Sequence, residues 1–248
     1  MDSTQLADTL ADPIGKIGMA YYFSPLAKER ARAMGTNAYV LYAAGRGGVL
    51  GEATAVEVDD AFYFFKAGMI AAAVEKGHAV ATPGEAAAAH LEVASEFARV
   101  HLASVGETTL RDFVDAARAL ADTLPTGRWP LVDGYLALRT VLDPDAEAYY
   151  WTIVLRELRC GVHLEATKAA GLTAAQSCQL DSFAGAFELH GYGDEDRSEV
   201  TDELRAARAA AEADTTARMA ALLDVLTDAQ RAALAQGAAA LRTAIPEG

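Results

Sequence analysis

The residues best suited to chemistry in this sequence are an arginine and a histidine that lie close to glycines. Arg46 lies within Gly45–Gly51, and its planar guanidinium could make two parallel hydrogen bonds to an anionic or carbonyl group. His163 follows Gly161 and could act as an acid or a base, because imidazole titrates near neutral pH. Each also has a structural interpretation: Arg46 could bind the carbonyl groups at a helix end, and His163 could be an ordinary turn residue. Arg46 and His163 are therefore the two catalytic candidates, with both interpretations open.

An aromatic run that ends in a lysine is the second feature of interest. Phe62 to Phe65 fall inside a helix predicted from about residue 58 to residue 76, and a helix that is apolar all round is buried or lines a cavity. Lys66 follows directly, so one side of its ammonium group would be shielded from water and could pair with a carboxylate ligand. The aromatic run could equally be ordinary core.

The sequence contains none of the standard short motifs for phosphate, dinucleotide or metal binding, and none for a serine nucleophile. His90 and His101 fall on one face of a predicted helix, but their separation of about 16 Å along its axis is too large for one metal ion, and we interpret both as structural. We interpret Cys160 and Cys178 as small core residues and not as a disulfide pair. No metal site is predicted, and no cofactor is expected from these motifs.

The charge balance argues against a nucleic-acid partner. The 248 residues include 35 acidic and 21 basic ones, which gives a formal net charge of −14. Affinity for DNA comes largely from Lys and Arg that displace counterions from phosphates, and a field of this sign opposes that contact. No run of about 18 uncharged apolar residues is present, and the acidic start is unlike a signal peptide. We expect a cytoplasmic protein with no membrane partner.

The elements that must position these residues centre on Tyr149–Phe183, which has the order of a helix-turn-helix. Its first helix carries an apolar stripe that includes Trp151, and we predict a break at Gly161. A short helix then leads to Gly171, which suits a tight corner, and Thr173 has the spacing of a capping box for a third helix. That third helix contains no Lys or Arg, which again disfavours DNA.

The rest of the chain is predicted to be mainly α. Start and stop signals indicate helices over the approximate ranges 25–35, 36–46, 58–76, 83–104, 110–124, 131–141, 198–225 and 228–243. Only residues 49–58 have the alternation that could form a β-hairpin.

A linker divides the chain in this interpretation. Proline, glycine and Trp129 cluster near residues 125–130, so we predict an N-terminal helical module over 1–125 and a C-terminal helix-turn-helix-like module over 126–248. The segment that begins near Tyr21 is weakly similar to the segment that begins at Tyr149, which predicts that the two modules are tandem copies. The long C-terminal helices could pack across the two halves or form a homodimer, and the first of them could equally be a solvated surface helix.

Three segments carry a resemblance to a known family. The segments are Gly45-Arg46-Gly47-Gly48-Val49-Leu50-Gly51 for G-R-A-A-P-L-G, Phe62-Tyr63-Phe64-Phe65-Lys66-Ala67 for F-Y-N-F-H-P, and Leu155-Arg156-Glu157-Leu158-Arg159-Cys160-Gly161-Val162-His163 for L-R-E-H-R-G-D-G-H. Over about residues 21–241 the chain resembles an actinobacterial family of helix-turn-helix, winged-helix-like proteins, mostly of unassigned function. The resemblance implies a fold of tandem helix-turn-helix or winged-helix-like modules with C-terminal helices.

The departures from these patterns matter as much as the matches. The first lacks its proline, Phe64 and Lys66 replace Asn and His in the second, and Leu158 replaces a His in the third. The pattern residues that remain here are Arg46, Phe62, Phe65, Arg156, Arg159 and His163. A polar constellation that has become partly apolar indicates a pocket adapted to a less polar ligand. Loss of an ancestral activity explains the same residues.

Three functions remain open at this point. The favoured one is a small-molecule binding protein, or an enzyme of specialised metabolism, that holds a hydrophobic ligand among its helices and does not bind DNA. The alternatives are a helix-turn-helix transcriptional regulator and a partner-binding structural dimer. The predicted ligand-binding residues are Tyr42, Arg46, Phe62, Phe65, Lys66, Trp151, Arg156, Arg159 and His163.

Overall fold

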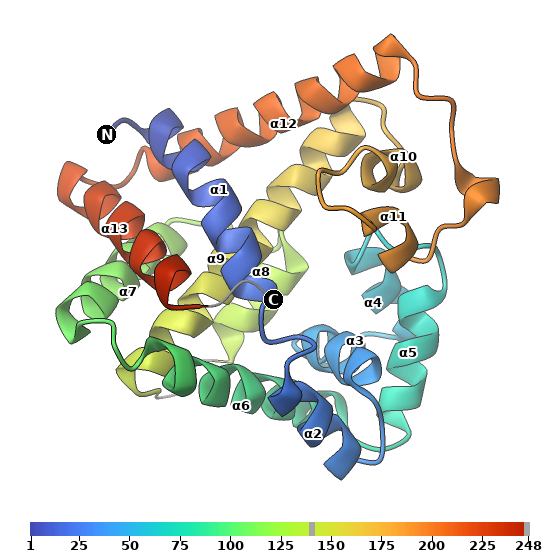
Figure 1. The fold of residues 1–248 in the computed structure, drawn as a ribbon, viewed down its shortest axis with the longest axis horizontal. Helices are drawn as coiled ribbons and strands as arrows, with labels where there is room; N and C mark the ends of the chain where they lie inside the picture. Colours follow the sequence, from blue (N-terminus) through green and yellow to red (C-terminus); the bar gives the residue numbers. More distant parts are fainter. Residues whose placement is uncertain (139–141, 246–248) are drawn as a thin grey trace.

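The computed structural model describes residues 1–138 and 142–245, and this part of the chain consists of helices joined by turns and loops (Figure 1). It contains thirteen α-helices, one 3-10 turn and no strand, which confirms the predicted mainly α class. Their bounds are α1 Ser3–Met19, α2 Pro25–Ala33, α3 Ala38–Gly48, α4 Ala55–Ala61, α5 Met69–His78, α6 Pro83–Leu102, α7 Glu107–Ala121, α8 Pro130–Ala137, α9 Pro144–Ala169, α10 Ala174–Gln179, α11 Ala186–Leu189, η1 Asp194–Asp196, α12 Asp202–Leu223 and α13 Asp228–Ala244. The last three residues of the helix predicted over 131–141 lie outside the described residues.

The segment between α3 and α5 differs from the prediction. No hairpin forms over residues 49–58, because α3 ends at Gly48 with Val49 as its C-cap, and α4 begins after Thr54 in a capping box. The single helix predicted over 58–76 is two helices, since Gly68 adopts a left-handed backbone with φ of 84°. The Asp59 carboxylate accepts hydrogen bonds from three backbone amides at the start of α5 and fixes this break. The aromatic run therefore occupies the turn between α4 and α5.

The helix-turn-helix segment also departs from the prediction at one point. α9 continues through Gly161 to Ala169 without the predicted break, and the glycine leaves room for the Trp129 ring, which packs where a side chain would stand. The turn itself is as predicted: Gly171 has φ of 73°, and Thr173 begins a capping box with Gln176. The third helix of the motif, α10, ends earlier than expected.

α9 is the centre of the packing. It runs diagonally through the molecule in Figure 1, and it packs against α1, α6, α7, α8 and α12. Near the two chain ends, α1 packs on both α12 and α13, and α13 also packs on α7. One cluster of buried apolar side chains extends from Leu6 to Ile245. The core is therefore continuous across the predicted boundary at residues 125 and 126.

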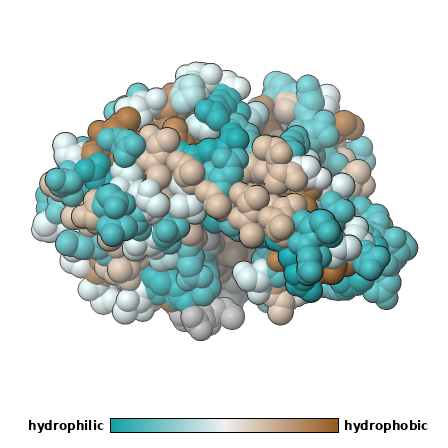
Figure 2. All heavy atoms as spheres, turned by 90° about the horizontal axis from the view of Figure 1, so that it is seen from above, coloured by the Kyte–Doolittle hydropathy of each residue, from teal (hydrophilic) through white to brown (hydrophobic). Residues whose placement is uncertain are grey.

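None of the described helices is long and apolar enough to cross a membrane. Figure 2 shows the face above the view of Figure 1, where strongly hydrophobic residues form small separated patches among hydrophilic ones.

Candidate functional site

A cavity of about 570 Å³ lies where α3, the α4–α5 turn, α8 and α9 meet. Its walls are largely aromatic and aliphatic, and we call it the aromatic cavity. The apolar residues that line it include Leu50, Ala53, Ala61, Phe62, Phe64, Phe65, Trp129, Leu131 and Leu164. This volume is within the range of sites that enclose a small organic molecule.

Three charged side chains form the floor of the aromatic cavity, and we call them the buried ion cluster. Arg46 donates through Nε to Glu157 Oε1 at 2.8 Å and through Nη2 to Oε2 at 2.7 Å. Arg156 Nη1 donates to the same Oε1 at 3.1 Å, and Arg46 Nη1 donates to the Tyr42 hydroxyl at 3.3 Å. Burial alone would raise the pKa of Glu157, but the two guanidiniums outweigh burial and lower it, so the carboxylate is ionised.

The glycine-rich end of α3 places Arg46 in this cluster. A side chain on Gly48 would overlap the backbone carbonyl of Pro83, and one on Gly45 would overlap His90, so the glycines let α3 lie directly against α6. Arg46 then points inward, and its Cζ lies 4.1 Å from the centre of the Phe62 ring. Close helix packing and one cation–π contact therefore fix the guanidinium.

Arg156 reaches the cavity by a different route. Its methylene carbons cross Gly18 of α1, where an added side chain would lie 2.6 Å from Arg156 Cδ. Its Cζ lies 5.3 Å from the centre of the Tyr22 ring, and its side chain keeps 16% of its surface exposed. Its bond to Glu157 is its only hydrogen bond within the described residues. Arg156 thus has N–H donors that no described residue accepts.

Neutral groups surround the buried ion cluster. His90 Nε2 lies 2.7 Å from the Tyr21 hydroxyl, and burial, with the positive charge of Arg46, lowers the pKa of His90 to about 3. The buried hydroxyls of Tyr22 and Tyr135 have no hydrogen-bond partner among the described residues. Burial raises the pKa of both phenols, so both keep their protons.

His190 supplies a polar group to the cavity wall. Its Nδ1 lies 2.6 Å from the Ala186 carbonyl, so Nδ1 carries the proton and Nε2 of the neutral ring is an acceptor. Burial lowers the pKa of His190, which favours the neutral form. The ring centre lies 4.5 Å from that of Phe65.

The mouth of the cavity carries ion pairs. Arg128 donates to Glu165 at 2.9 and 2.6 Å, and Trp129 Nε1 donates to Glu165 Oε1 at 3.1 Å. Glu57 and Asp60 are exposed beside them. The aromatic cavity therefore combines a charged mouth with apolar walls.

A family model described as a helix-turn-helix family matches residues 7–197. The chain belongs to this helix-turn-helix family. No curated protein and no solved structure matches it.

In this helix-turn-helix family member, the three sequence segments meet at the aromatic cavity. Arg46 from the first segment binds Glu157 from the third, and Phe62 from the second packs on Arg46. The predicted ligand-binding residues that line the cavity are Tyr42, Arg46, Phe62, Phe65 and Arg156.

The other predicted residues lie elsewhere. Lys66 binds Glu195 and Asp196 on the surface, at 3.2 and 2.7 Å. Trp151 lines a separate hollow beside α7 and α8. Arg159 and His163 face α12.

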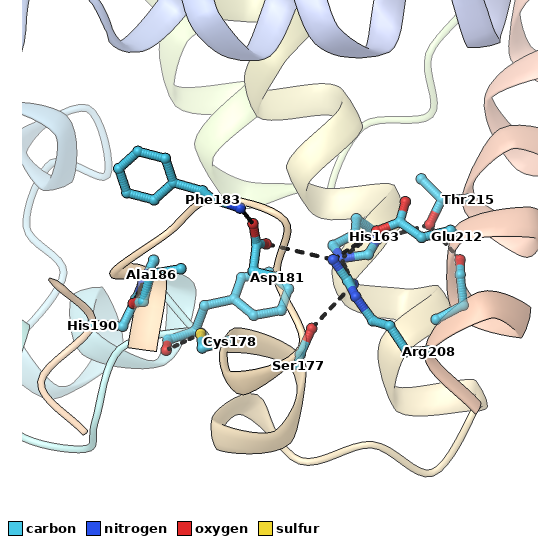
Figure 3. A network of polar contacts seen from close by, with 12 residues as sticks. His163, Ser177, Cys178, Asp181, Phe183, Ala186, His190, Arg208, Glu212 and Thr215 are labelled. Carbon is cyan, nitrogen blue, oxygen red and sulfur yellow. Dashed lines mark hydrogen bonds and ion pairs between the residues drawn. The ribbon is translucent and has the colours of Figure 1, made fainter. Parts of the chain in front are cut away.

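Figure 3 shows the network that surrounds His163, which includes Arg208, Glu212 and Thr215 of α12. Arg208 of α12 donates through Nη1 to His163 Nε2 at 2.8 Å, so His163 Nδ1 carries the proton and donates to Thr215 Oγ1 at 2.9 Å. Glu212 binds Arg208 at 2.7 Å and Arg159 at 3.4 Å. Burial lowers the pKa of His163 to about 4, although Glu212 opposes this. The network fastens α12 to α9 in this family member.

The cavity residues that the sequence did not predict include Trp129, Glu157, Cys160 and His190. Glu157 had a sequence signal, because an acidic residue between arginines in the middle of an apolar helix needs a partner. Trp129 was assigned to a linker. His190 lies in a glycine-rich turn, where no periodic pattern indicates which way a side chain points.

Proposed function

We propose that this protein holds a small, largely apolar molecule in the aromatic cavity, as a binding protein or as an enzyme of specialised metabolism, and that it does not read DNA. The single observation that carries the proposal is a cavity of about 570 Å³ with aromatic walls and a buried ion pair at its floor. Burying an ion pair costs hydration free energy, so such a pair is weak evidence for a role in stability alone. Ligand pockets commonly combine apolar walls with a few fixed polar groups.

The helix in the DNA-reading position of the motif supports the second half of the proposal. α10 has no Lys or Arg, and Ser177 and Cys178 on it are buried. Its Gln179 side chain exchanges hydrogen bonds with the Ser198 backbone at 2.9 Å in both directions. These polar groups are therefore occupied within the chain. The net charge of −14 acts in the same direction.

The departures from the family pattern fit an apolar ligand. Phe64 lines the cavity where the pattern has Asn, and its ring stacks on His163 with centres 5.6 Å apart. A member adapted to a less polar ligand would gain apolar wall at this position while keeping Arg46 and Arg156 at the floor.

The test of this proposal uses N-phenyl-1-naphthylamine, a neutral apolar dye that fluoresces when it leaves water. We expect saturable binding at one site per chain. Leu164→Trp should fill part of the cavity and abolish binding, whereas Ala169→Trp, on the exposed end of the same helix, should leave binding unchanged. Equal binding by both variants would contradict the proposal.

The regulator hypothesis, which the family description favours, has its own measurement. Fluorescence anisotropy with mixed-sequence duplex DNA should show no binding by the wild-type chain at low salt. Tight binding that weakens steeply as salt rises would support a regulator and overturn our proposal.

A further inference from the structure

We propose that the molecule held in the aromatic cavity is an organic carboxylate with one negative charge and a flat apolar body, and that Arg156 is the residue that binds the carboxylate. This inference rests on the proposed function, because it names the class of ligand for the same site. It depends on three observations: the charge left over in the buried ion cluster, the free donors of Arg156, and the shape of the walls.

The buried ion cluster has one positive charge in excess. Arg46 and Arg156 are both cationic, and Glu157 is the one buried carboxylate beside them in the described residues. His90 and His190 are neutral, since burial lowers the pKa of each. Tyr22, Tyr42 and Tyr135 keep their protons, since burial raises the pKa of each. A buried charge without a partner is unfavourable, so the floor favours an anion.

Arg156 has more donors available for that anion than Arg46 has. Arg46 uses Nε and Nη2 on Glu157 and Nη1 on Tyr42. Arg156 gives one bond to Glu157 and has no other partner in the described part of the chain. A guanidinium edge presents two parallel donors, which match the two oxygens of a carboxylate. A phosphate dianion would bring a second negative charge close to Glu157, so a monoanion fits better.

The acidic mouth does not cancel the positive floor. Glu57 and Asp60 are exposed to water, Glu57 accepts hydrogen bonds from the Thr54 hydroxyl and amide, and Glu165 is neutralised by Arg128 and Arg218. Charges in contact with water are screened within about 8 Å at physiological salt, whereas buried charges are screened much less. The mouth would repel polyanions such as nucleic acids and admit a single carboxylate.

The walls indicate a flat body. Phe62 covers the floor arginine, and Trp129 is held in place by its bond to Glu165 and by its contact with Gly161. Rigid aromatic walls favour a planar hydrocarbon that can stack or pack edge-on against them.

Two probes of one shape test the charge requirement. They are 2-naphthoate and 2-naphthamide, which differ in the charge of one group. Each would compete with N-phenyl-1-naphthylamine for the wild-type chain, with isothermal titration as the direct measurement. We expect the carboxylate to bind at least tenfold more tightly than the amide.

Two variants test the assignment to Arg156. Arg156→Met keeps an apolar stem over Gly18 and removes the charge, and it should weaken naphthoate at least tenfold while the affinity for naphthamide changes less than twofold. Arg99→Met, which removes a surface arginine paired with Asp143, is the matched control and should change neither affinity. Dye binding by Arg156→Met shows that its cavity is intact. If that variant loses dye binding, Arg156→Lys must bind naphthoate more tightly than naphthamide.

The outcomes separate this inference from the proposed function. If neither probe nor the dye binds the wild-type chain, the proposed function fails. If the dye binds but naphthoate binds no more tightly than naphthamide, the anion inference alone is overturned. Loss of naphthoate binding in Arg99→Met to the same degree as in Arg156→Met would also overturn it, because a general loss of charge would then explain the effect.

Discussion

Arg46 and Glu157 are 111 residues apart in the sequence, yet their side chains share two hydrogen bonds, 2.8 and 2.7 Å long, at the floor of one cavity. The carboxylate is fully buried and the guanidinium nearly so. The hydration that both groups lose on burial offsets much of their mutual attraction. The pair therefore orients the two side chains more than it adds to the net stability of the fold. It fixes the end of α3 against the middle of α9 and sets the shape of the cavity.

Glu157→Gln should destabilise the protein strongly, because it leaves Arg46 and Arg156 buried without a negative partner. We expect a loss of about 3–5 kcal/mol in the free energy of unfolding, measured by urea denaturation. The double variant Arg46→Met, Glu157→Met removes both charges of the pair and should lose less than Glu157→Gln. A Glu157→Gln protein as stable as wild type would show that the pair does not have this role.

The sequence predicted the mainly α class and the helix-turn-helix corner, because capping boxes and apolar stripes are local signals. It placed the aromatic run inside one helix. The break before α5 depends on the Asp59 carboxylate, which lies nine residues before Gly68, and no periodic pattern in the sequence indicates a cap at that distance. Five of the predicted ligand-binding residues line the cavity. The glycines beside Arg46 and the aromatic run that contains Phe62 and Phe65 drew attention to this region, because both features are unusual in a helix. His163 and Arg159 were assigned to the ligand because their partners, Arg208 and Glu212, come from a distant helix that the sequence does not place beside α9.

Gly48→Ala should destabilise the protein by about 1–3 kcal/mol, because the new methyl group would overlap the Pro83 carbonyl, which is backbone and has little room to move. Gly84→Ala is the matched control on α6, where no atom lies within 4 Å of the added group, and it should be neutral or stabilising by up to about 1 kcal/mol. Thermal unfolding of both variants checks the difference. Equal melting temperatures would mean that α3 and α6 do not need this close approach.

His90 should make stability depend on pH in the acidic range. Its folded-state pKa of about 3 lies below the ordinary value of 6.5, so the unfolded chain binds a proton that the folded chain rejects. The contribution of His90 is therefore fully present above pH 6.5 and declines as the pH falls toward 3, by at most about 1.4 kcal/mol per pH unit.

Urea denaturation at several pH values, compared between wild type and His90→Gln, measures this contribution. The variant should lose less stability between pH 6.5 and pH 4 than wild type does. His163 has a lowered pKa of the same sign, so part of the slope remains in the variant. A replacement at exposed His78 is the control. An unchanged slope in His90→Gln would exclude His90 as the source.

His163→Ala should loosen α12 without changing ligand affinity. The imidazole joins Arg208 and Thr215 of α12 to α9, and it does not line the aromatic cavity. We expect a loss of about 1–3 kcal/mol from the unsatisfied partners, and faster amide hydrogen exchange in α12. Hydrogen exchange and dye titration on one preparation check both statements. A variant that kept its stability but lost the dye would return His163 to the ligand site.

The most direct measurement of the central claim is a crystal structure of the protein with 2-naphthoate. Our account predicts that the naphthalene ring lies between Phe62 and Trp129, with its carboxylate within hydrogen-bonding distance of Arg156. A naphthoate bound elsewhere, or a ring reversed so that its carboxylate points to the mouth at Arg128, would contradict the account.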